Sequence, residues 1–136
     1  MIIAESCGAI LRHARDGDLP DVDRVTIICY EPIQESYVAM VGEDCYEAVR
    51  ADPELTWQER KTGQVRRLYS EHPERLWVLE EGGLIGFVTF ELRPAANLGV
   101  IANNGVVPEH RGRGLGRFMY RHVLQHFREQ GLRFAF

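Results

Sequence analysis

The stretch Val106-Val107-Pro108-Glu109-His110-Arg111-Gly112-Arg113-Gly114-Leu115-Gly116-Arg117-Phe118 determines which kind of fold this sequence can adopt. An apolar run ends in a proline, three glycines follow at alternate positions, and an amphipathic pattern begins after them. This order predicts a strand, a glycine-rich turn and the first turn of a helix. The first N–H groups of a helix have no internal partner, and glycine lets an anion approach them closely. A phosphate or pyrophosphate is therefore the expected ligand.

Two well-known glycine-rich motifs do not fit this segment, and a third does. A P-loop requires Gly-Lys-Ser/Thr, and the segment contains no lysine. A dinucleotide-binding G-x-G-x-x-G fails in both registers, because Arg117 or Met119 stands at the sixth position. The spacing Arg-x-x-Gly-x-Gly does fit, with Arg111, Gly114 and Gly116. A tight strand-to-helix turn without a ligand is the purely structural alternative.

The fitting motif resembles the acetyl-CoA loop of the GNAT family of N-acetyltransferases, usually written Gln/Arg-x-x-Gly-x-Gly/Ala. The preceding Val-x-Pro-x-x-Arg-Gly, here residues 106–112, is similar to that family's usual lead-in. The resemblance implies that residues 111–116 hold the pyrophosphate, that the pantetheine arm pairs with the strand around residues 105–107, and that the N–H of Val106 polarises the thioester. The cofactor-binding residues expected on this basis are Val106, Val107, Arg111, Gly112, Arg113, Gly114, Leu115, Gly116 and Arg117.

The activity that the resemblance implies is transfer of an acetyl group from acetyl-CoA to a primary amine of a small-molecule or peptide acceptor. The amine must lose a proton, so a base is needed. Many relatives carry a glutamate in the strand before the loop, but residues 98–108 contain no carboxylate and no histidine. The remaining catalytic candidates are Glu91, as a nearby carboxylate, and Asn103 and Asn104, which could position a water. Each of the three also has a structural interpretation, such as a solvent-exposed glutamate at a strand end.

The rest of the sequence predicts a mixed α/β fold with a mainly antiparallel sheet and flanking helices. The expected strands cover residues 9–15, 76–79, 84–90, 99–107 and 132–136. The expected helices begin near Pro20, with Asp18 as a cap, and cover residues 34–50, 56–71 and 114–130. Residues 21–30 remain ambiguous between helix and strand. At the level of single residues, we expect a capping box of Thr56 and Glu59 and a hairpin turn at 81–83. We also expect a bulge or a close approach at Gly105, and core positions for Tyr120 and Phe127.

Length, charge and composition limit the number of domains, the kind of ligand and the expected location of the protein. The 136 residues suit a single domain over 1–136. The net charge of −4 divides into −9 for residues 1–110 and +5 for residues 111–136, which favours a specific anionic ligand over nucleic acid, although a solvated arginine face is also compatible. We expect a cytoplasmic protein with no membrane or nucleic-acid partner, because no long apolar run or signal sequence is present. His122 and His126 lack a third ligand, so no metal is expected.

The family pattern also extends beyond this sequence. It continues past the last predicted strand into another helix, which often bears a tyrosine that protonates the leaving thiolate, and into further strands. We therefore expect a C-terminally truncated form of the fold that is a poor catalyst. It would be either a fragment or a homodimer that covers the apolar edge of Leu132, Phe134 and Phe136. The alternative function is a non-catalytic acyl-CoA-binding or regulatory module.

Overall fold

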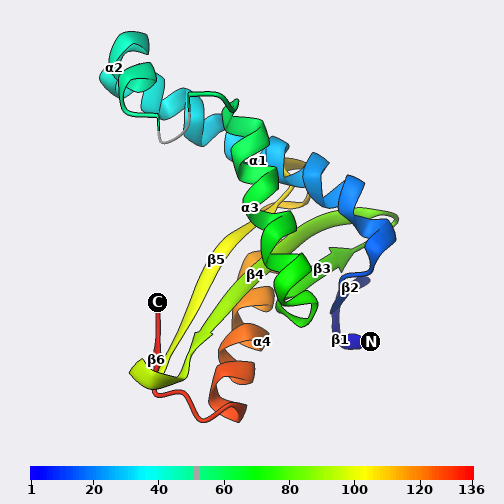
Figure 1. Ribbon diagram of the computed structural model, residues 1–136. Helices are drawn as coiled ribbons and strands as arrows, with labels where there is room; N and C mark the ends of the chain where they lie inside the picture. Colours follow the sequence, from blue (N-terminus) through cyan, green and yellow to red (C-terminus); the bar gives the residue numbers. More distant parts are fainter. Residues whose placement is uncertain (51–52) are drawn as a thin grey trace.

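A single twisted sheet with helices on both faces forms the body of the protein (Figure 1). The computed structural model describes residues 1–50 and 53–136. Within them the strands follow the order β1 (Ile2–Ser6), β2 (Ala9–His13), β3 (Leu76–Glu80), β4 (Leu84–Arg93), β5 (Leu98–Val106) and β6 (Phe134–Ala135). The helices are α1 (Leu19–Val41), α2 (Glu43–Ala48), α3 (Trp57–Glu71) and α4 (Leu115–Glu129). Strands β1 to β5 pair antiparallel and β6 pairs parallel to β5, which confirms the expected mixed fold.

Turns and helix ends, which depend on residues that are adjacent in the sequence, agree with the sequence-based predictions. The hairpin of β3 and β4 turns at Gly82 and Gly83, whose φ angles are 64° and 138°. At the start of α3 the N–H of Glu59 donates to the Thr56 hydroxyl at 3.1 Å, and the N–H of Thr56 donates to the Glu59 carboxylate at 3.0 Å. The predicted capping box is therefore confirmed. Gly131, with φ 77°, ends α4 as expected.

The N-terminal half differs from the prediction at four places. Strand β1 was not predicted, and α1 runs through the ambiguous residues 21–30 as one continuous helix. Its buried residues Val22 and Val25 belong to the core, so tertiary packing overrides their strand propensity. The helix expected over 34–50 is divided at Gly42, which has φ 83°. Asp18 lies at the N-cap of α1 but makes no cap hydrogen bond, because its carboxylate binds Arg12 at 2.7 and 2.9 Å.

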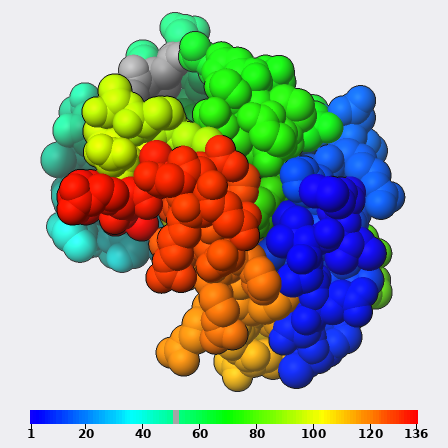
Figure 2. Space-filling model, turned by 90° about the horizontal axis from the view of Figure 1, so that it is seen from below, coloured from blue at the N-terminus to red at the C-terminus, as the bar shows by residue number. Residues whose placement is uncertain are grey.

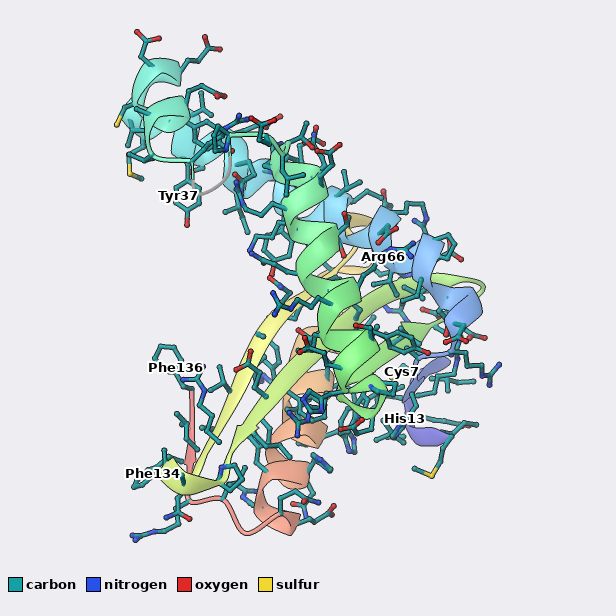
Figure 3. All side chains as sticks on the ribbon, viewed as in Figure 1. Cys7, His13, Tyr37, Arg66, Phe134 and Phe136 are labelled. Atoms are coloured by element: carbon teal, nitrogen blue, oxygen red, sulfur yellow. The ribbon has the colours of Figure 1, made fainter. Side chains whose placement is uncertain are left out.

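The outer end of α1 and the short α2 project beyond the sheet, where Tyr37 is labelled in Figure 3. Large apolar side chains of this region are exposed. Tyr37 is 52% exposed, Met40 75% and Val49 71%. Phe134 and Phe136, at the opposite side of the molecule in Figure 3, are also exposed. No helix among residues 1–50 and 53–136 is long and apolar enough to cross a membrane.

The hydrophobic core lies between β4 and the helices on either face. Phe87, Val88 and Phe90 of β4 are fully buried, and Phe127 of α4 packs against Phe90 with ring centroids 5.8 Å apart. Phe127 also occupies the position that a side chain at Gly99 would need, so glycine is required there for α4 to dock on β5. Figure 2 shows this face, with α4 running beside the N-terminal strands. The packing fixes where α4 starts relative to the end of β5.

Candidate functional site

A hollow of about 350 Å³ lies where β5 ends and α4 begins. It brings the last residues of the strand together with the glycine-rich loop and the first turns of the helix. Its lining consists of Asn104, Gly105, Val106, His110, Arg111, Gly112, Gly114, Leu115, Gly116, Met119 and Tyr120. Most of the residues that the sequence singled out for a pyrophosphate therefore surround one cavity.

The loop backbone leaves its N–H groups available for a ligand. Gly112 and Gly114 have φ angles of 80° and 77°, a conformation that other residues adopt only with strain. Within the described part of the chain, no backbone or side-chain acceptor pairs with the N–H groups of residues 112–117. A Cβ atom at Gly112, Gly114 or Gly116 would meet nothing within 4 Å, so no protein atom fills this space. These N–H groups and the partial positive charge of the α4 N-terminus suit an anionic ligand.

The outer edge of β5 is open beside this loop. Strand β6 pairs with Leu98 and Gly99, and the N–H of Ile101 donates to the carbonyl of Phe136 at 2.8 Å, so this pairing covers the end of β5 that is far from the loop (Figure 1). The N–H of Val107 donates to the carbonyl of Ile85 in β4 at 2.8 Å. Because alternate residues of a strand direct their N–H groups to opposite sides, the N–H groups of Val106 and Asn104 point away from β4. This edge can therefore pair with an extended ligand as a sheet pairs with an added strand.

Val107 is placed differently from the expectation that it contacts the cofactor. Its N–H is bonded to Ile85, its carbonyl accepts the N–H of His110 at 3.0 Å, and its side chain is 5% exposed. It does not line the hollow. Val107 therefore anchors the end of the strand, and Asn104 offers the second outward N–H beside Val106. The sequence could not show this because it does not fix which strand edge each residue faces.

The three arginines of the loop have different surroundings. The guanidinium of Arg113 donates to the Glu81 carboxylate at 2.6 and 3.1 Å, and this hydrogen bond lowers the pKa of Glu81. The Nε of Arg111 donates to the carbonyl of Val106 at 2.9 Å. Arg117 is exposed and makes no hydrogen bond or ion pair with another described residue. Of the three charges, that of Arg117 is the one not engaged by the protein.

Asn103 and Asn104 lie side by side in the sequence but point to opposite faces of the sheet. Asn104 meets two tyrosines: its N–H donates to the Tyr30 hydroxyl at 3.2 Å, and its side-chain oxygen accepts the Tyr120 hydroxyl at 2.5 Å. The side-chain oxygen of Asn103 instead accepts the ammonium of Lys61 at 3.3 Å. The two asparagine side chains therefore cannot both position a water at one reacting atom. Only Asn104 lines the hollow at the loop.

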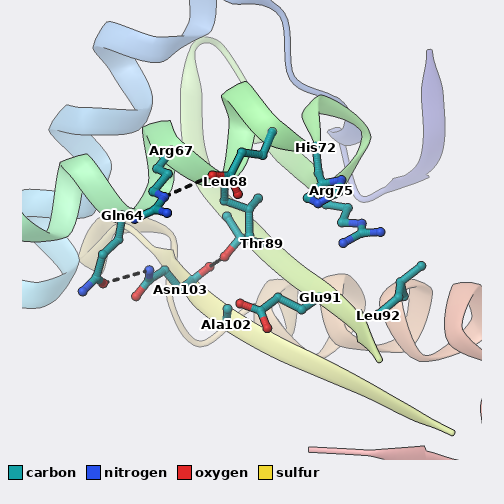
Figure 4. A pocket seen from close by; sticks show the side chains of 11 residues that line it. Gln64, Arg67, Leu68, His72, Arg75, Thr89, Glu91, Leu92, Ala102 and Asn103 are labelled. Carbon is teal, nitrogen blue, oxygen red and sulfur yellow. Dashed lines mark hydrogen bonds and ion pairs between the residues drawn. The ribbon is translucent and has the colours of Figure 1, made fainter. Parts of the chain in front are cut away.

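Glu91 belongs to a second cavity, a groove of about 560 Å³ between α3 and strands β4 and β5 (Figure 4). Its lining is Gln64, Arg67, Leu68, Glu71, His72, Arg75, Thr89, Glu91, Leu92, Ala102 and Asn103. Glu91 lies three residues along β4 from Val88, the partner of Asn104, which places it about 10 Å along the sheet from that N–H. The Glu91 carboxylate accepts a hydrogen bond from Arg93 at 3.2 Å. Glu91 therefore lines the groove and does not adjoin the outward N–H groups.

The groove and the open edge of β5 meet at a bulge in that strand. The register between β4 and β5 shifts between Val88 and Phe90, so β5 carries an extra residue opposite Thr89. The Thr89 hydroxyl donates to the carbonyl of Asn103 at 2.9 Å and holds the bulge in place. The bulge lies just before Gly105, at which the sequence indicated a bulge or a close approach. At Gly105 itself the close approach is observed, because a Cβ there would lie 2.6 Å from the sulfur of Cys29.

Three residues near the open edge were not predicted as site residues. Tyr30 comes from the part of α1 that the sequence left ambiguous, and burial raises its pKa. Tyr120 was expected in the core but is 38% exposed and reaches Asn104. Lys61 lies on α3, and burial lowers its pKa. The one available signal was that Lys61 is the only lysine in the sequence.

The two histidines of α4 pack against aromatic rings. The ring centroid of His126 lies 5.5 Å from that of Trp77 and 5.3 Å from that of Phe90. His122 packs on Phe118 at 4.9 Å. Residues 1–50 and 53–136 contain no group of three or more side chains placed to hold a metal ion.

The acetyltransferase (GNAT) family model matches residues 42–136, which include the loop and strand that border the hollow. The chain belongs to the GNAT family. The match includes α3, the sheet from β3 onward, the glycine-rich loop and α4. No curated protein matches the sequence.

Solved structures share the GNAT fold. A GNAT acetyltransferase from Brucella melitensis in complex with acetyl-CoA is 21% identical with a TM-score of 0.64, over 93% of this chain and 73% of that one. The PaiA N-acetyltransferase of Thermoplasma acidophilum in complex with coenzyme A is 16% identical with a TM-score of 0.64, over 91% and 74%. A Pyrococcus horikoshii protein is 16% identical with a TM-score of 0.66, over 93% of this chain but 37% of its own. At these identities the likeness shows the fold.

Proposed function

We propose that this GNAT-family chain transfers an acetyl group from acetyl-CoA to a primary amine of a small-molecule or peptide acceptor, with residues 1–136 acting as one domain. The observation that supports this proposal is that two sets of backbone N–H groups border the same hollow. The free N–H groups of residues 112–117 lie next to the outward N–H groups of Val106 and Asn104. A ligand with a pyrophosphate at one end and an extended, amide-containing arm matches both features.

The loop and the strand have separate roles in this proposal. The N–H groups of residues 112–116 hold the pyrophosphate, and the side chain of Arg117 adds an unpaired positive charge nearby. The open edge of β5 holds the pantetheine arm in an extended conformation. The N–H of Val106 donates to the thioester carbonyl and stabilises the negative charge that develops on it during attack by the amine. Acetyl-CoA, as the donor substrate, supplies the activated acetyl group.

The groove in Figure 4 is the proposed acceptor side. It meets the open edge of β5 at Asn103, so an amine lying in it can approach the edge where the thioester would be held. Glu91, about 10 Å along the strand from the N–H of Asn104, holds or deprotonates a distal part of the acceptor. Asn103 lies nearest to the edge and orients the amine or a water that removes its proton. Asn104 holds the edge in place through its tyrosine partners.

Two measurements test the proposal. Calorimetry with acetyl-CoA should show binding to the folded protein, and coenzyme A release should appear with at least one member of a panel of amines. No binding at millimolar acetyl-CoA would reject the cofactor site. Binding without release for any amine would instead support an acyl-CoA-binding module.

A substitution in the first turn of α4 distinguishes two contributions to acetyl-CoA binding: the access of the ligand to the backbone N–H groups and the positive charge of Arg117. Gly116 is helical, and a Cβ there meets no protein atom within 4 Å, so Gly116→Val should fold while filling the hollow. We expect at least about a tenfold loss of acetyl-CoA affinity, equivalent to about 1.4 kcal/mol. Arg117→Ala should lose about 1 kcal/mol or less, because the side chain is exposed.

Gly116→Ala is the matched control. The family pattern allows alanine at this position, so binding should be kept, while helix propensity should raise the free energy of unfolding by about 0.5–1 kcal/mol. Equal losses of affinity in the valine variant and in Arg117→Ala would show that charge, and not access to the backbone, governs the site.

A further inference from the structure

Lys61 is the only lysine in the protein, and it lies beside the proposed reaction site. It is on the first turns of α3, on the face that packs towards α1 and β5. Its ammonium nitrogen lies 3.3 Å from the side-chain oxygen of Asn103 and 4.6 Å from the centre of the Tyr30 ring. One turn further along α3, Gln64 accepts a hydrogen bond from the same Asn103 side chain at 3.4 Å. Lys61 therefore stands at the end of the groove that meets the open edge of β5.

Tyr30 links this lysine to the edge of the strand. Its hydroxyl accepts the outward N–H of Asn104 at 3.2 Å, while the face of its ring lies under the ammonium of Lys61. An oxygen atom thus already occupies an acceptor position on the open strand edge, two residues before the N–H of Val106 that is proposed to hold the thioester carbonyl. A single tyrosine ring separates that position from the lysine nitrogen. If the Tyr30 side chain turns aside, the flexible lysine side chain can extend along this edge towards a thioester carbonyl held by the N–H of Val106.

Burial and a neighbouring positive charge make it easier for Lys61 than for a fully exposed lysine to lose a proton and form the neutral, nucleophilic amine. No carboxylate forms an ion pair with it within the described residues. Its other side lines a hollow of about 390 Å³ whose wall includes Tyr37, Val41 and Val49. Burial there, together with the positive charge of Arg60, lowers the pKa of Lys61.

We propose that Lys61 is an acetylation site of this protein and that it accepts an acetyl group from acetyl-CoA bound at its own β5 edge. This inference rests on the acetyl-CoA site proposed above. The Lys61 nitrogen forms a bond to the thioester carbonyl carbon, and the bond between that carbon and sulfur breaks. The proton lost by the nitrogen goes to the departing thiolate, so the products are one acetyl-lysine and one coenzyme A.

Acetylation of Lys61 would change the charge and the shape of the end of the groove that meets β5. Acetyl-Lys61 carries no charge over the Tyr30 ring, and its nitrogen keeps a single N–H for Asn103. The added acetyl group projects towards the position that an acceptor amine would occupy. Acetylation of Lys61 is therefore expected to compete with acceptor amines, slowing coenzyme A release from a protein that has been incubated with acetyl-CoA alone.

The test is incubation of the full chain with acetyl-CoA and no amine, followed by intact mass and peptide mapping. The expected result is one added acetyl group on the peptide that contains Lys61, at a rate per molecule that does not change when the protein is diluted. Mapping separates this product from acetylation of the N-terminal amine. Lys61→Arg, which keeps the charge, should lack the modified peptide. Gly116→Val, with the cofactor hollow filled, should acetylate Lys61 at least about tenfold more slowly if its affinity loss is at least about tenfold.

Three results would overturn the inference, and they differ in what they say about the proposed function. If Lys61 stays unmodified while amines release coenzyme A, the acetylation site is wrong and the transferase stands. If Lys61 is modified equally fast in Gly116→Val, or in protein unfolded by urea, the reaction is uncatalysed chemistry at an exposed amine. If acetyl-CoA does not bind at all, both proposals fail.

Discussion

Replacing Gly105 by alanine tests the close approach between α1 and the strand that borders the proposed site. A Cβ at this position would lie 2.6 Å from the sulfur and 2.7 Å from the Cβ of Cys29, which is buried in α1. Carbon atoms in contact are ordinarily about 3.5–4.0 Å apart, so α1 and β5 would have to separate by about 1 Å. Overpacking of this kind costs about 1–3 kcal/mol. For a chain of this length the melting temperature should fall by about 3–5 °C for each kcal/mol.

The assay is urea and thermal unfolding of four variants in a double-mutant cycle. Cys29→Gly removes both clashing atoms, so its combination with Gly105→Ala should recover about 1–2 kcal/mol relative to the sum of the single changes. Gly63→Ala is the matched control, because a Cβ there meets nothing within 4 Å in α3. That change should stabilise the protein by about 0.5–1 kcal/mol. If Gly105→Ala is as stable as the wild type, or if the cycle shows no coupling, the packing of α1 on β5 is not as described.

The remaining predictions concern stability. Thr56→Ala removes the helix cap of α3 and should lower the free energy of unfolding by about 1 kcal/mol in urea titrations; no change would mean that the cap is replaced by solvent. A hydrogen bond from Arg12 lowers the pKa of Asp18 below its ordinary value of 3.8, so the carboxylate stabilises the fold above that pH and loses this contribution as the pH falls through the depressed pKa. Asp18→Asn should therefore cost about 3 kcal/mol at neutral pH and progressively less in acid, and a pH-independent loss would contradict this. The hydrogen bond to Asp16 raises the pKa of Tyr69 to about 12, so its contribution is present below pH 10 and lost as the pH rises through about 12. Tyr69→Phe should remove the highest-titrating phenol from the ultraviolet absorbance curve, and an unchanged curve would refute the assignment.

The sequence predicted well those elements whose cause lies within a few residues. The glycine-rich loop, the hairpin turn at Gly82 and Gly83, the capping box at Thr56 and the end of α4 at Gly131 were all predicted. Backbone angles and caps depend on adjacent residues, so a local pattern contains the information. Residues 21–30 show the limit, because their strand propensity was overridden by burial of Val22 and Val25 against the sheet.

The positions of the catalytic candidates relative to one another depend on sheet register and helix packing, which the sequence does not show. Asn103 and Asn104 are neighbours in the chain, yet alternation along the strand sends their side chains to opposite faces. Glu91 was chosen as the best remaining carboxylate, at the end of a predicted strand, but the antiparallel register pairs it with Val100 and moves it along the strand from the open edge. Tyr120 shows a helical spacing compatible with the core, and only the position of α4 shows that its hydroxyl reaches Asn104.

The sequence by itself determined that this chain contains a strand–loop–helix unit of the GNAT type, because the glycines at 112 and 114 permit the positive φ angles that the loop adopts. Only the tertiary structure decided what surrounds that unit. Tyr30 reaches Asn104 across 74 residues, and Lys61 reaches Asn103 across 42. Contacts over such separations depend on the register of the sheet and on how α1 and α3 pack across it. Both are set by the burial of many side chains together, and no short pattern of residues specifies them.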